Sequence, residues 1–246
     1  MDEAAYRQYE LESENWLKAG RRNLLARQIH HAMNSRNDME ILDLGSGVGQ
    51  NVPALQKFGL VDVLEINEIG LQALRAKRGI REIFDQPIPF ELDRRYDVIV
   101  ATDVLEHLSD DRGAAQWVAD HLRPGGVFFS TVPAYQFLFS EHDVALHHFR
   151  RYTATNYADI MPASLNVERC GYFNSILFPI AAAARLASRF RRSEVTSADQ
   201  AKKQSSVVPA PVDAAFRSIL ELEIKMIDKR IGLPFGLSVY CLARRT

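Results

Sequence analysis

Short hydrophobic runs alternate with helix-length stretches along most of the chain. The runs are rich in β-branched and aromatic residues, which is typical of strands. Strands that alternate with helices favour a parallel sheet covered by helices on both faces. The runs lie at 40–44, 61–66, 80–84, 96–102 and 126–132, and the clearest helices between them at 51–58, 70–77 and 111–122. The pattern predicts a doubly wound α/β fold.

The segments before and after this alternation extend the prediction. The first 35 residues carry apolar side chains at helical spacing, and we expect N-terminal helices that pack over the open end of the sheet. Two further strands at 166–173 and 237–243 give a Rossmann-like, mostly parallel sheet of seven strands. Between them lies a helical insertion, with helices predicted at 179–192 and 213–231. The polar composition around 193–206 predicts a mobile stretch.

A length of 246 residues fits a single large α/β domain. We expect all of 1–246 to form one domain built from four segments. These segments are an N-terminal helical cap (1–38), the core of the sheet (39–172), the helical insertion (173–236) and the last strand (237–246).

Composition and charge narrow the range of partners and compartments. With 30 basic and 31 acidic residues the net charge is -1, so no overall field attracts nucleic acid, and we expect no nucleic-acid partner. Cys170 and Cys241 are too few for a disulfide framework, and the N-terminal sequence has no secretory pattern. The sequence has no run of 18 apolar residues, the length that would predict a membrane span. We therefore expect a cytoplasmic protein.

The segment ILDLGSGVGQN (41–51) has the features of a ligand-binding turn. An apolar strand ends in an acid and is followed by glycines at 45, 47 and 49, which allow a sharp turn and a close approach of ligand to backbone. A dinucleotide-binding fingerprint needs a third glycine where this chain has Gln50. The motif therefore counts against a nicotinamide-dependent oxidoreductase.

Acidic residues follow three further strands. Glu65 stands at the end of the second strand, where an acid can hydrogen-bond a ribose diol. Asp85 follows the third strand and Asp103 the fourth. A single acid of this kind is more often a solvated or capping carboxylate. Their shared position at the carboxyl edge of a parallel sheet predicts a ligand pocket there.

Several blocks together resemble class I S-adenosylmethionine-dependent methyltransferases. They are DLGSGVG, the acid at 65, FD at 84–85, YDVIVATDVLEHLSDD (96–111) and LRPGGVFFSTVPA (122–134). The segment 132–153 and the two ends, ENWLKAGRRNLL and PFGLSVYCLARR, resemble a bacterial subfamily often associated with surface polysaccharide, glycolipid or natural-product pathways. That subfamily usually has glycine where this chain has His147. We therefore expect a stiffer or differently folded loop at this position.

The resemblance implies S-adenosyl-L-methionine as the cofactor and assigns residues to it. Asp43, Gly45, Gly47 and Gly49 would surround its methionine part, with Asp103 on the same side. Glu65 would hold the ribose hydroxyls and Asp85 the adenine amino group. The neighbours Ser46, Ile66 and Gln86 would complete the pocket, and Trp16, Arg21 and Arg22 are candidates to close over it.

The segment SEHDVALHHFRRY (140–152) holds the candidates for catalysis. We predict His142 or His148 as a general base for a hydroxyl acceptor, oriented by Asp143. In a second interpretation, Arg150 and Arg151 bind an anionic acceptor. A metal site made of His142, Asp143 and His148 has no recognised spacing, and we expect no metal. The segment can also be a lid with a purely structural role.

The remaining candidates are less specific. His107 is expected to pack under the sheet edge, and Tyr135 is a candidate ring on the acceptor side. The helix at 179–192 would place Arg185, Arg189 and Arg192 on one face and apolar residues on the other. Such a helix either docks on the protein's own core or makes a weak peripheral contact with the inner face of a membrane.

The sequence therefore predicts a methyltransferase acting on a small-molecule, sugar or lipid-linked acceptor, with oxygen as the expected methylated atom. The alternatives are a protein that binds S-adenosylmethionine without catalysis and an aminopropyl transferase, which uses a related donor on the same fold. The identity of the acceptor and the oligomeric state stay open.

Overall fold

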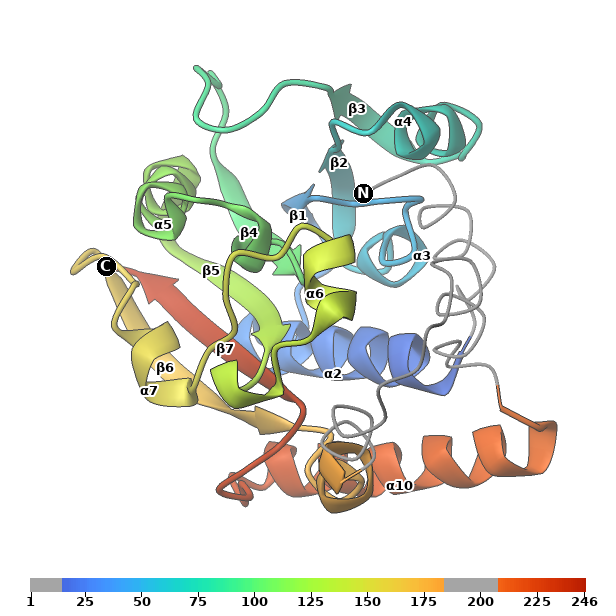
Figure 1. Cartoon of the computed structure of the whole chain (residues 1–246). Helices are drawn as coiled ribbons and strands as arrows, with labels where there is room; N and C mark the ends of the chain where they lie inside the picture. Colours follow the sequence, from blue (N-terminus) through green and yellow to red (C-terminus); the bar gives the residue numbers. More distant parts are fainter. Residues whose placement is uncertain (1–14, 184–207) are drawn as a thin grey trace.

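The computed structural model describes residues 15–183 and 208–246, and its centre is one seven-stranded sheet. The strand order is β3-β2-β1-β4-β5-β7-β6, and β7 runs antiparallel to both of its neighbours (Figure 1). This confirms the mostly parallel, doubly wound prediction. The strands are β1 (Met39–Leu44), β2 (Gly59–Leu64), β3 (Ile80–Phe84), β4 (Tyr96–Thr102), β5 (Leu122–Pro133), β6 (Leu165–Phe173) and β7 (Ser238–Arg245).

The helices begin where capping residues or prolines favour it. Asn15 caps α2 and Asn67 caps α4 through their side-chain oxygens, while α10 has a proline in its first turn. The helices are α2 (Trp16–Ala32), α3 (Val52–Leu55), α4 (Glu68–Arg75), α5 (Asp111–His121), α6 (Glu141–Ala145), α7 (Ala154–Ala158) and α10 (Ala210–Asp228). Two 3-10 turns, η1 (Leu105–His107) and η2 (Gln136–Leu138), follow β4 and β5.

Part of the predicted insertion lies outside the described residues. Residues 178–183 are helical, in agreement with the start of the predicted helix. The rest of that helix, with Arg185, Arg189 and Arg192, and the stretch at 193–206 are not among the residues described. In the described part of the chain, no helix has the length and apolar content needed to cross a membrane.

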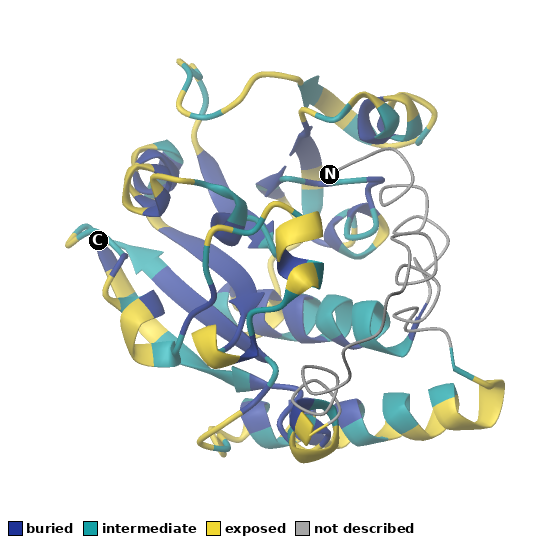
Figure 2. Ribbon diagram, in the orientation of Figure 1, coloured by how far each residue is buried: buried dark blue, intermediate teal, exposed yellow. Residues whose placement is uncertain are grey.

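Two hydrophobic clusters cover the two faces of the sheet. Neighbouring residues on a strand point to opposite faces, so Ile41 joins one cluster and Leu42 the other. The first cluster packs under α2 and α10, and the second under α5 and α7 (Figures 1 and 2). Both faces of the central strands are therefore buried, as is usual for parallel sheets.

The position of α2 differs from the prediction. Instead of covering the open end of the sheet, α2 lies along one face beside α10 (Figure 1). Gly20 permits this close approach, because a Cβ atom there would lie 2.4 Å from Cδ1 of Leu220. Leu24, Leu25 and Ile29 are fully buried in the first cluster, and this apolar stripe explains why the helix packs on the face.

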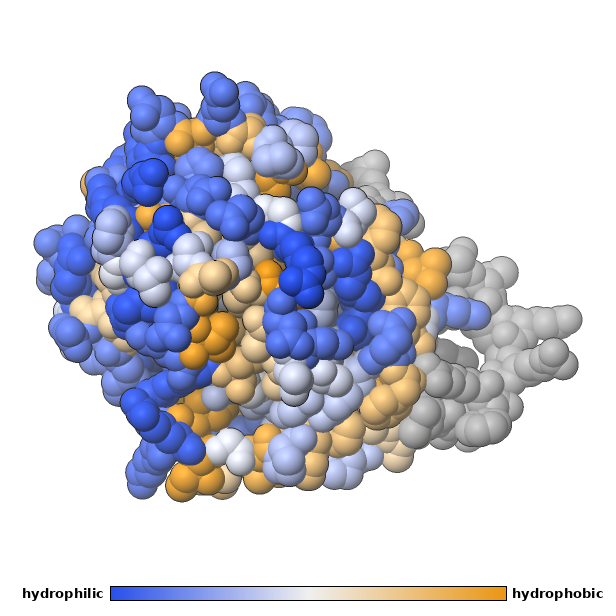
Figure 3. Space-filling model, turned by 90° about the vertical axis from the view of Figure 1, so that its left-hand side faces the viewer, coloured by the Kyte–Doolittle hydropathy of each residue, from blue (hydrophilic) through white to orange (hydrophobic). Residues whose placement is uncertain are grey.

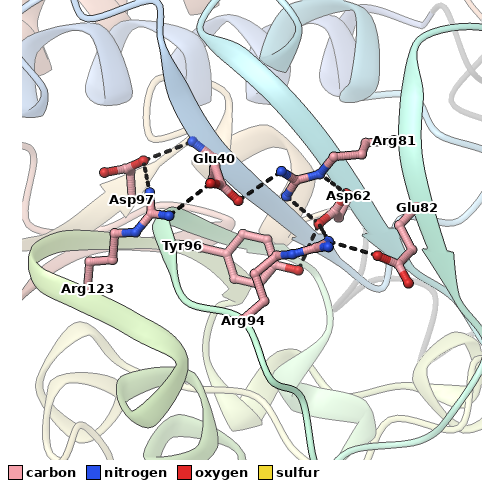
Figure 4. A network of polar contacts seen from close by, with 8 residues as sticks. All are labelled: Glu40, Asp62, Arg81, Glu82, Arg94, Tyr96, Asp97 and Arg123. Atoms are coloured by element: carbon pink, nitrogen blue, oxygen red, sulfur yellow. Dashed lines mark hydrogen bonds and ion pairs between the residues drawn. The ribbon is translucent and has the colours of Figure 1, made fainter.

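A network of charged side chains joins β1 to β5 at their amino ends (Figure 4). Its centre is Asp62, which is fully buried and accepts hydrogen bonds from Arg81 at 2.8 and 2.7 Å, from Arg94 at 2.7 Å and from the Tyr96 hydroxyl at 2.9 Å. The glycine-rich turn lies at the opposite edge, after the carboxyl end of β1. The surface that faces left in Figure 1 carries hydrophobic patches scattered among hydrophilic residues (Figure 3).

Candidate active site

The turn after β1 contains three glycines in the left-handed conformation. The φ angles of Gly45, Gly47 and Gly49 are 66, 59 and 74°, values that residues with a Cβ atom rarely adopt. A Cβ on Gly45 would also lie 2.6 Å from Cγ2 of Val104, the second residue after β4. The turn therefore lies against the exit of β4, at the carboxyl edge of the sheet.

Asp43 and Ser46 support this turn from inside the protein. Asp43 is fully buried and accepts hydrogen bonds from the Ser46 hydroxyl at 2.8 Å and from Asn51 at 3.3 Å. Burial raises the pKa of Asp43 to about 6, although these two hydrogen bonds act in the opposite direction. Both oxygens of Asp43 therefore have protein partners, and its side chain fixes the shape of the turn.

Glu65 connects the turn after β1 to the turn after β2. Its carboxylate accepts hydrogen bonds from the backbone N–H groups of Gly47 at 2.7 Å, Ile66 at 2.9 Å and Asn67 at 2.8 Å. A carboxylate has about four acceptor positions, so one is left for a ligand hydroxyl. The Ile66 side chain beside it is 61% exposed and offers an apolar surface to a flat ring.

The other predicted residues for the methyl donor lie at the ends of β3 and β4. Asp85 and Gln86 are exposed directly after β3, which pairs with β2. Asp103 has φ 56° and forms an ion pair with Arg21 of α2, while the Thr131 hydroxyl donates to it at 3.2 Å. Trp16 packs on Phe216 of α10, with ring centroids 4.9 Å apart. Of the N-terminal candidates, Arg21 therefore reaches the strand edge.

The loop at 140–152 is organised by Asp143, which is fully buried. Arg151 donates to both of its oxygens, at 2.7 and 2.9 Å, and Ser140 completes a capping box with it at the start of α6. Nδ1 of His148 lies 2.9 Å from Oδ1 of Asp143. Burial acts to raise the pKa of Asp143, but the hydrogen bonds from His148 and Arg151 outweigh it and hold the pKa well below its usual value.

This arrangement orients His148, one of the two predicted histidines. An ionised Asp143 can only accept a hydrogen bond, so Nδ1 of His148 carries the proton and Nε2 of the neutral ring keeps its lone pair. His148 is thus hydrogen-bonded to the acid that was predicted to orient the general base. The structure thus brings together Asp143 and His148 of the predicted catalytic set.

Arg150 and Arg151, the candidates for binding an anionic acceptor, both have acidic partners within the protein. The side chain of Arg151 is only 4% exposed, and its contacts go to Asp143 and to the Ala134 carbonyl. Arg150 pairs with Asp111 at 2.7 Å and donates to the Ser109 carbonyl. Both guanidinium groups therefore hold the loop in place.

His147 stands where the subfamily that this chain resembles usually has glycine. Its φ angle is 59°, in the left-handed region where glycine is the most comfortable residue. The loop therefore keeps the backbone conformation that glycine would favour, and histidine adopts it at some cost.

A second group of polar side chains lies in η1, next to this loop. The backbone N–H of Phe149 donates to the Glu106 carbonyl at 2.8 Å, which ties the loop to η1. The rings of His107 and His148 meet edge to face, with centroids 4.5 Å apart. Burial and the nearby His148 lower the pKa of His107 to about 4, so its ring is neutral near pH 7.

Glu106 is the most unusual member of this group. It is fully buried, and neither of its oxygens receives a hydrogen bond from another described residue. Burial and the neighbouring Asp103 raise its pKa well above the usual value. Glu106 was not among the residues predicted from the sequence, and His107 was expected to pack under the sheet edge. The signal available was the EH pair that follows β4 at the carboxyl edge.

An aromatic group lies beside the loop on the side of β5. Tyr135 stacks on Tyr172 with centroids 5.2 Å apart and contacts Phe137 and Phe178. Phe137 is 52% exposed, and Ile180, two residues after Phe178, is 72% exposed. These side chains form an apolar surface next to the predicted acceptor side.

Two curated relatives match parts of this chain. A trans-aconitate 2-methyltransferase of Deinococcus radiodurans is 30% identical over 141 residues, which are 55% of this chain and 52% of that protein. A ubiquinone biosynthesis O-methyltransferase of Leptothrix cholodnii is 28% identical over 114 residues, 42% of this chain and 48% of that protein. The matches thus span about half the length of these relatives.

The fold is also shared with solved structures and with a described family. The N-methyltransferase NodS of Bradyrhizobium japonicum, solved with S-adenosyl-L-homocysteine, superposes with a TM-score of 0.56 at 14% identity and covers 98% of both chains. The family described as a methyltransferase domain matches residues 17–175 of this chain. The chain therefore belongs to the methyltransferase domain family, as its resemblance to class I S-adenosylmethionine-dependent methyltransferases predicted.

Proposed function

We propose that this protein transfers the methyl group of S-adenosylmethionine to an oxygen atom of a small-molecule, sugar or lipid-linked acceptor. The left-handed glycine turn and Glu65 would hold the methyl donor at the carboxyl edge of the sheet. The hydroxyl oxygen attacks the methyl carbon, the carbon–sulfur bond breaks, and the sulfonium becomes a thioether. Alignment of the two reactants at about 3–3.5 Å supplies much of the rate.

The observation that carries the proposal for oxygen is the hydrogen bond between Asp143 and Nδ1 of His148, which leaves Nε2 as the nitrogen that can accept a proton. A hydroxyl must lose its proton during transfer, and a positioned group that assists this step contributes about 10²- to 10⁴-fold. Asp143 fixes the ring of His148 in the tautomer that leaves Nε2 available, beside His107 and Glu106. One matched relative is itself named as an O-methyltransferase.

The apolar surface near Tyr135 favours an acceptor with an apolar part. Phe137, which packs on Tyr135, is about half exposed, and Ile180, two residues after Phe178, is largely exposed. An exposed cluster of this kind is a common mark of a binding surface. The association with surface polysaccharide, glycolipid or natural-product pathways and a peripheral membrane contact through residues 179–192 belong to the same proposal.

The test is to incubate the purified protein with methyl-deuterated S-adenosylmethionine and a bacterial metabolite and glycolipid extract. We expect a product that is heavier by one labelled methyl group, located on oxygen by fragmentation. Transfer of an aminopropyl group from decarboxylated S-adenosylmethionine, which leaves the S-methyl group in the by-product methylthioadenosine, would instead support the aminopropyl transferase. Binding of S-adenosylhomocysteine without any product from such extracts would favour a binding protein.

His148→Ala separates turnover from binding of the methyl donor. We expect about a 100-fold or greater loss of turnover, in line with a lost proton-transfer aid, while the affinity for S-adenosylhomocysteine stays unchanged. His147→Asn is the matched control, because it changes an exposed neighbour whose left-handed backbone asparagine tolerates. Full turnover by His148→Ala would show that the loop has only a structural role.

A further inference from the structure

Glu106 is buried without a hydrogen-bond partner among the described residues. Both carboxylate oxygens are inaccessible to solvent and receive no hydrogen bond from another described residue. The nearest arginines are engaged elsewhere, Arg21 with Asp103 and Arg151 with Asp143. Buried carboxylates without a partner are rare in folded proteins, because the loss of hydration costs several kcal/mol. A cation at this position would complete the site.

Two imidazole rings face the same position. One ligand atom each from Glu106, His107 and His148 can be chosen so that all three lie within 4.8 Å of one another. Ligands at about 2.0–2.2 Å from a tetrahedral cation lie roughly 3.3–3.6 Å apart, so binding would draw these atoms together by up to about 1.5 Å. The three residues come from η1 and from the loop at 140–152, which the hydrogen bond from Phe149 to the Glu106 carbonyl holds together.

One nitrogen of each ring has a partner of the kind that orients metal ligands. Nδ1 of His148 donates to the carboxylate of Asp143. The carbonyl of Leu146 accepts a hydrogen bond from His107. Histidines that bind metals usually donate their other N–H to a carboxylate or a backbone carbonyl, which fixes the tautomer and the orientation of the ring.

We propose that Glu106, His107 and His148 bind one divalent transition-metal cation. Two imidazole nitrogens and one carboxylate suit zinc, iron, cobalt or nickel, whereas magnesium and calcium prefer oxygen ligands alone. Three protein ligands leave coordination positions open, as in catalytic rather than structural sites. This site differs from the rejected combination of His142, Asp143 and His148, because Asp143 serves here to orient His148.

The cation would activate the acceptor, and this consequence rests on the proposed function. A hydroxyl bound to a divalent cation is far more acidic than a free one. Its proton passes to solvent, and the resulting alkoxide oxygen attacks the methyl carbon of the sulfonium. When the cation is bound, His148 is a metal ligand. Its lone pair then binds the cation, and the cation activates the acceptor.

Cobalt binding tests the site directly. The full chain is treated with a chelator, dialysed and titrated with Co²⁺, whose visible absorption reports coordination by nitrogen ligands. We expect the unchanged protein to bind one equivalent of Co²⁺. In His107→Ala and in His148→Ala the affinity for Co²⁺ should fall by more than the roughly 10- to 100-fold that is typical of a residue that only orients a ligand. His147→Asn should bind Co²⁺ like the unchanged protein. Absent binding, or binding that persists in both alanine variants, would overturn the proposal.

Glu106→Gln is a second test, which distinguishes the loss of a ligand from a loss of Co²⁺ binding through misfolding. The amide keeps the shape of the side chain but removes the anionic ligand. We expect weaker Co²⁺ binding and no decrease in the melting temperature of the metal-free protein, since a neutral amide is less costly to bury than an unpaired carboxylate. A clear fall in that melting temperature, with Co²⁺ affinity retained, would show that Glu106 has a structural role only.

Assays of methyl-donor binding and of methyl transfer distinguish a failure of the metal site from a failure of the proposed function. S-adenosylhomocysteine binding and label transfer are followed in chelator-treated protein with and without Zn²⁺. We expect binding of the methyl-donor product in both conditions and label transfer only with the cation. Undiminished transfer in the chelated protein would contradict the metal while leaving the methyltransferase function intact.

Discussion

Several residues around the candidate site adopt backbone conformations that few side chains tolerate. Besides the glycines of the turn after β1, Asp103, Tyr135 and His147 have φ angles of 56, 59 and 59°. A positive φ at such residues costs about 1–2 kcal/mol and persists only where neighbouring contacts enforce it. Here the contacts include the ion pair of Asp103 with Arg21 and the stack of Tyr135 on Tyr172. Three of the seven described non-glycine residues with positive φ therefore lie around the place where the methyl donor and the acceptor are proposed to meet.

Replacement of Gly47 by alanine tests the proposed contact with the methyl donor. The added Cβ would stand on the side where the ligand approaches the backbone, and the φ of 59° would be strained. We expect the affinity for S-adenosylhomocysteine to fall by about tenfold or more, equivalent to about 1.4 kcal/mol, in an isothermal titration.

Gly125→Ala is the matched control for this prediction. Gly125 also has a positive φ, 76°, but an added Cβ there meets no atom within 4 Å, and the residue lies in β5 among its first residues, far from the turn in the sequence. Both variants should lose similar stability, and only Gly47→Ala should lose affinity. Equal affinities in the two variants would exclude the contact.

The individual roles of these residues were only partly predictable. The sequence identified Glu65 by its place after a strand, but not that its carboxylate holds the backbone of both neighbouring turns. Asp43 was expected beside the ligand, whereas its two oxygens bind Ser46 and Asn51. The EH pair after β4 could have drawn attention to Glu106, but its lack of a hydrogen-bond partner is a property of the packed structure that the sequence does not reveal.

Among the elements, α10 and α2 depend on a close mutual contact. Leu220 is 1% exposed and lies against Gly20, whereas Leu222 on the same helix is 55% exposed. We expect Leu220→Ala to lower the free energy of unfolding by about 2–5 kcal/mol through loss of burial and formation of a cavity. Leu222→Ala should change it by no more than about 0.5 kcal/mol. Denaturant titration of both variants measures the difference, and comparable losses would argue against this packing.

The network around Asp62 predicts how stability depends on pH. Burial acts to raise the pKa of Asp62, but hydrogen bonds from Arg81, Arg94 and Tyr96 outweigh it, and the folded-state pKa is lowered. A lowered pKa contributes stability above the unfolded-state value of about 3.9, and this contribution is lost as the pH falls through the folded-state value. We expect Asp62→Asn to cost about 3–5 kcal/mol at pH 7 and progressively less below about pH 4.

Urea titrations of Asp62→Asn between pH 3 and pH 7 would measure this difference. Asp38→Asn is the control, since Asp38 pairs with Arg36 at the surface and its side chain is 73% exposed. That variant should have nearly unchanged stability throughout. A pH-independent deficit in Asp62→Asn would show that the loss comes from packing and not from ionisation.

Short elements were harder to predict than long ones. The helix α10 was expected from about 213 and begins at Ala210, because a proline in the first turn is compatible with a helix start. The helices α6 and α7, each of five residues, were not predicted. Such short helices show no hydrophobic periodicity, and a capping box stabilises each of them.

At the scale of the whole molecule, the alternation of hydrophobic runs was sufficient to predict the sheet. Strands buried on both faces are continuous apolar runs, and the run at 96–102 coincides with β4. The position of α2 was not predictable in the same way. Its place depends on which face the apolar stripe of Leu24, Leu25 and Ile29 meets, and that face is formed by strands distant in the sequence and by α10.

Binding of the methyl donor should stabilise the folded chain as a unit, because the proposed pocket joins the ends of β1, β2, β3 and β4. A ligand at 100 times its dissociation constant adds about 2.7 kcal/mol to the free energy of unfolding. For a chain of this size, 1 kcal/mol raises the melting temperature by about 2–4 °C, so S-adenosylhomocysteine should raise it by about 5–10 °C. NADH should give no shift, because the dinucleotide fingerprint has Gln50 in place of its third glycine. A shift with NADH and none with S-adenosylhomocysteine in a thermal scan would refute the proposed cofactor.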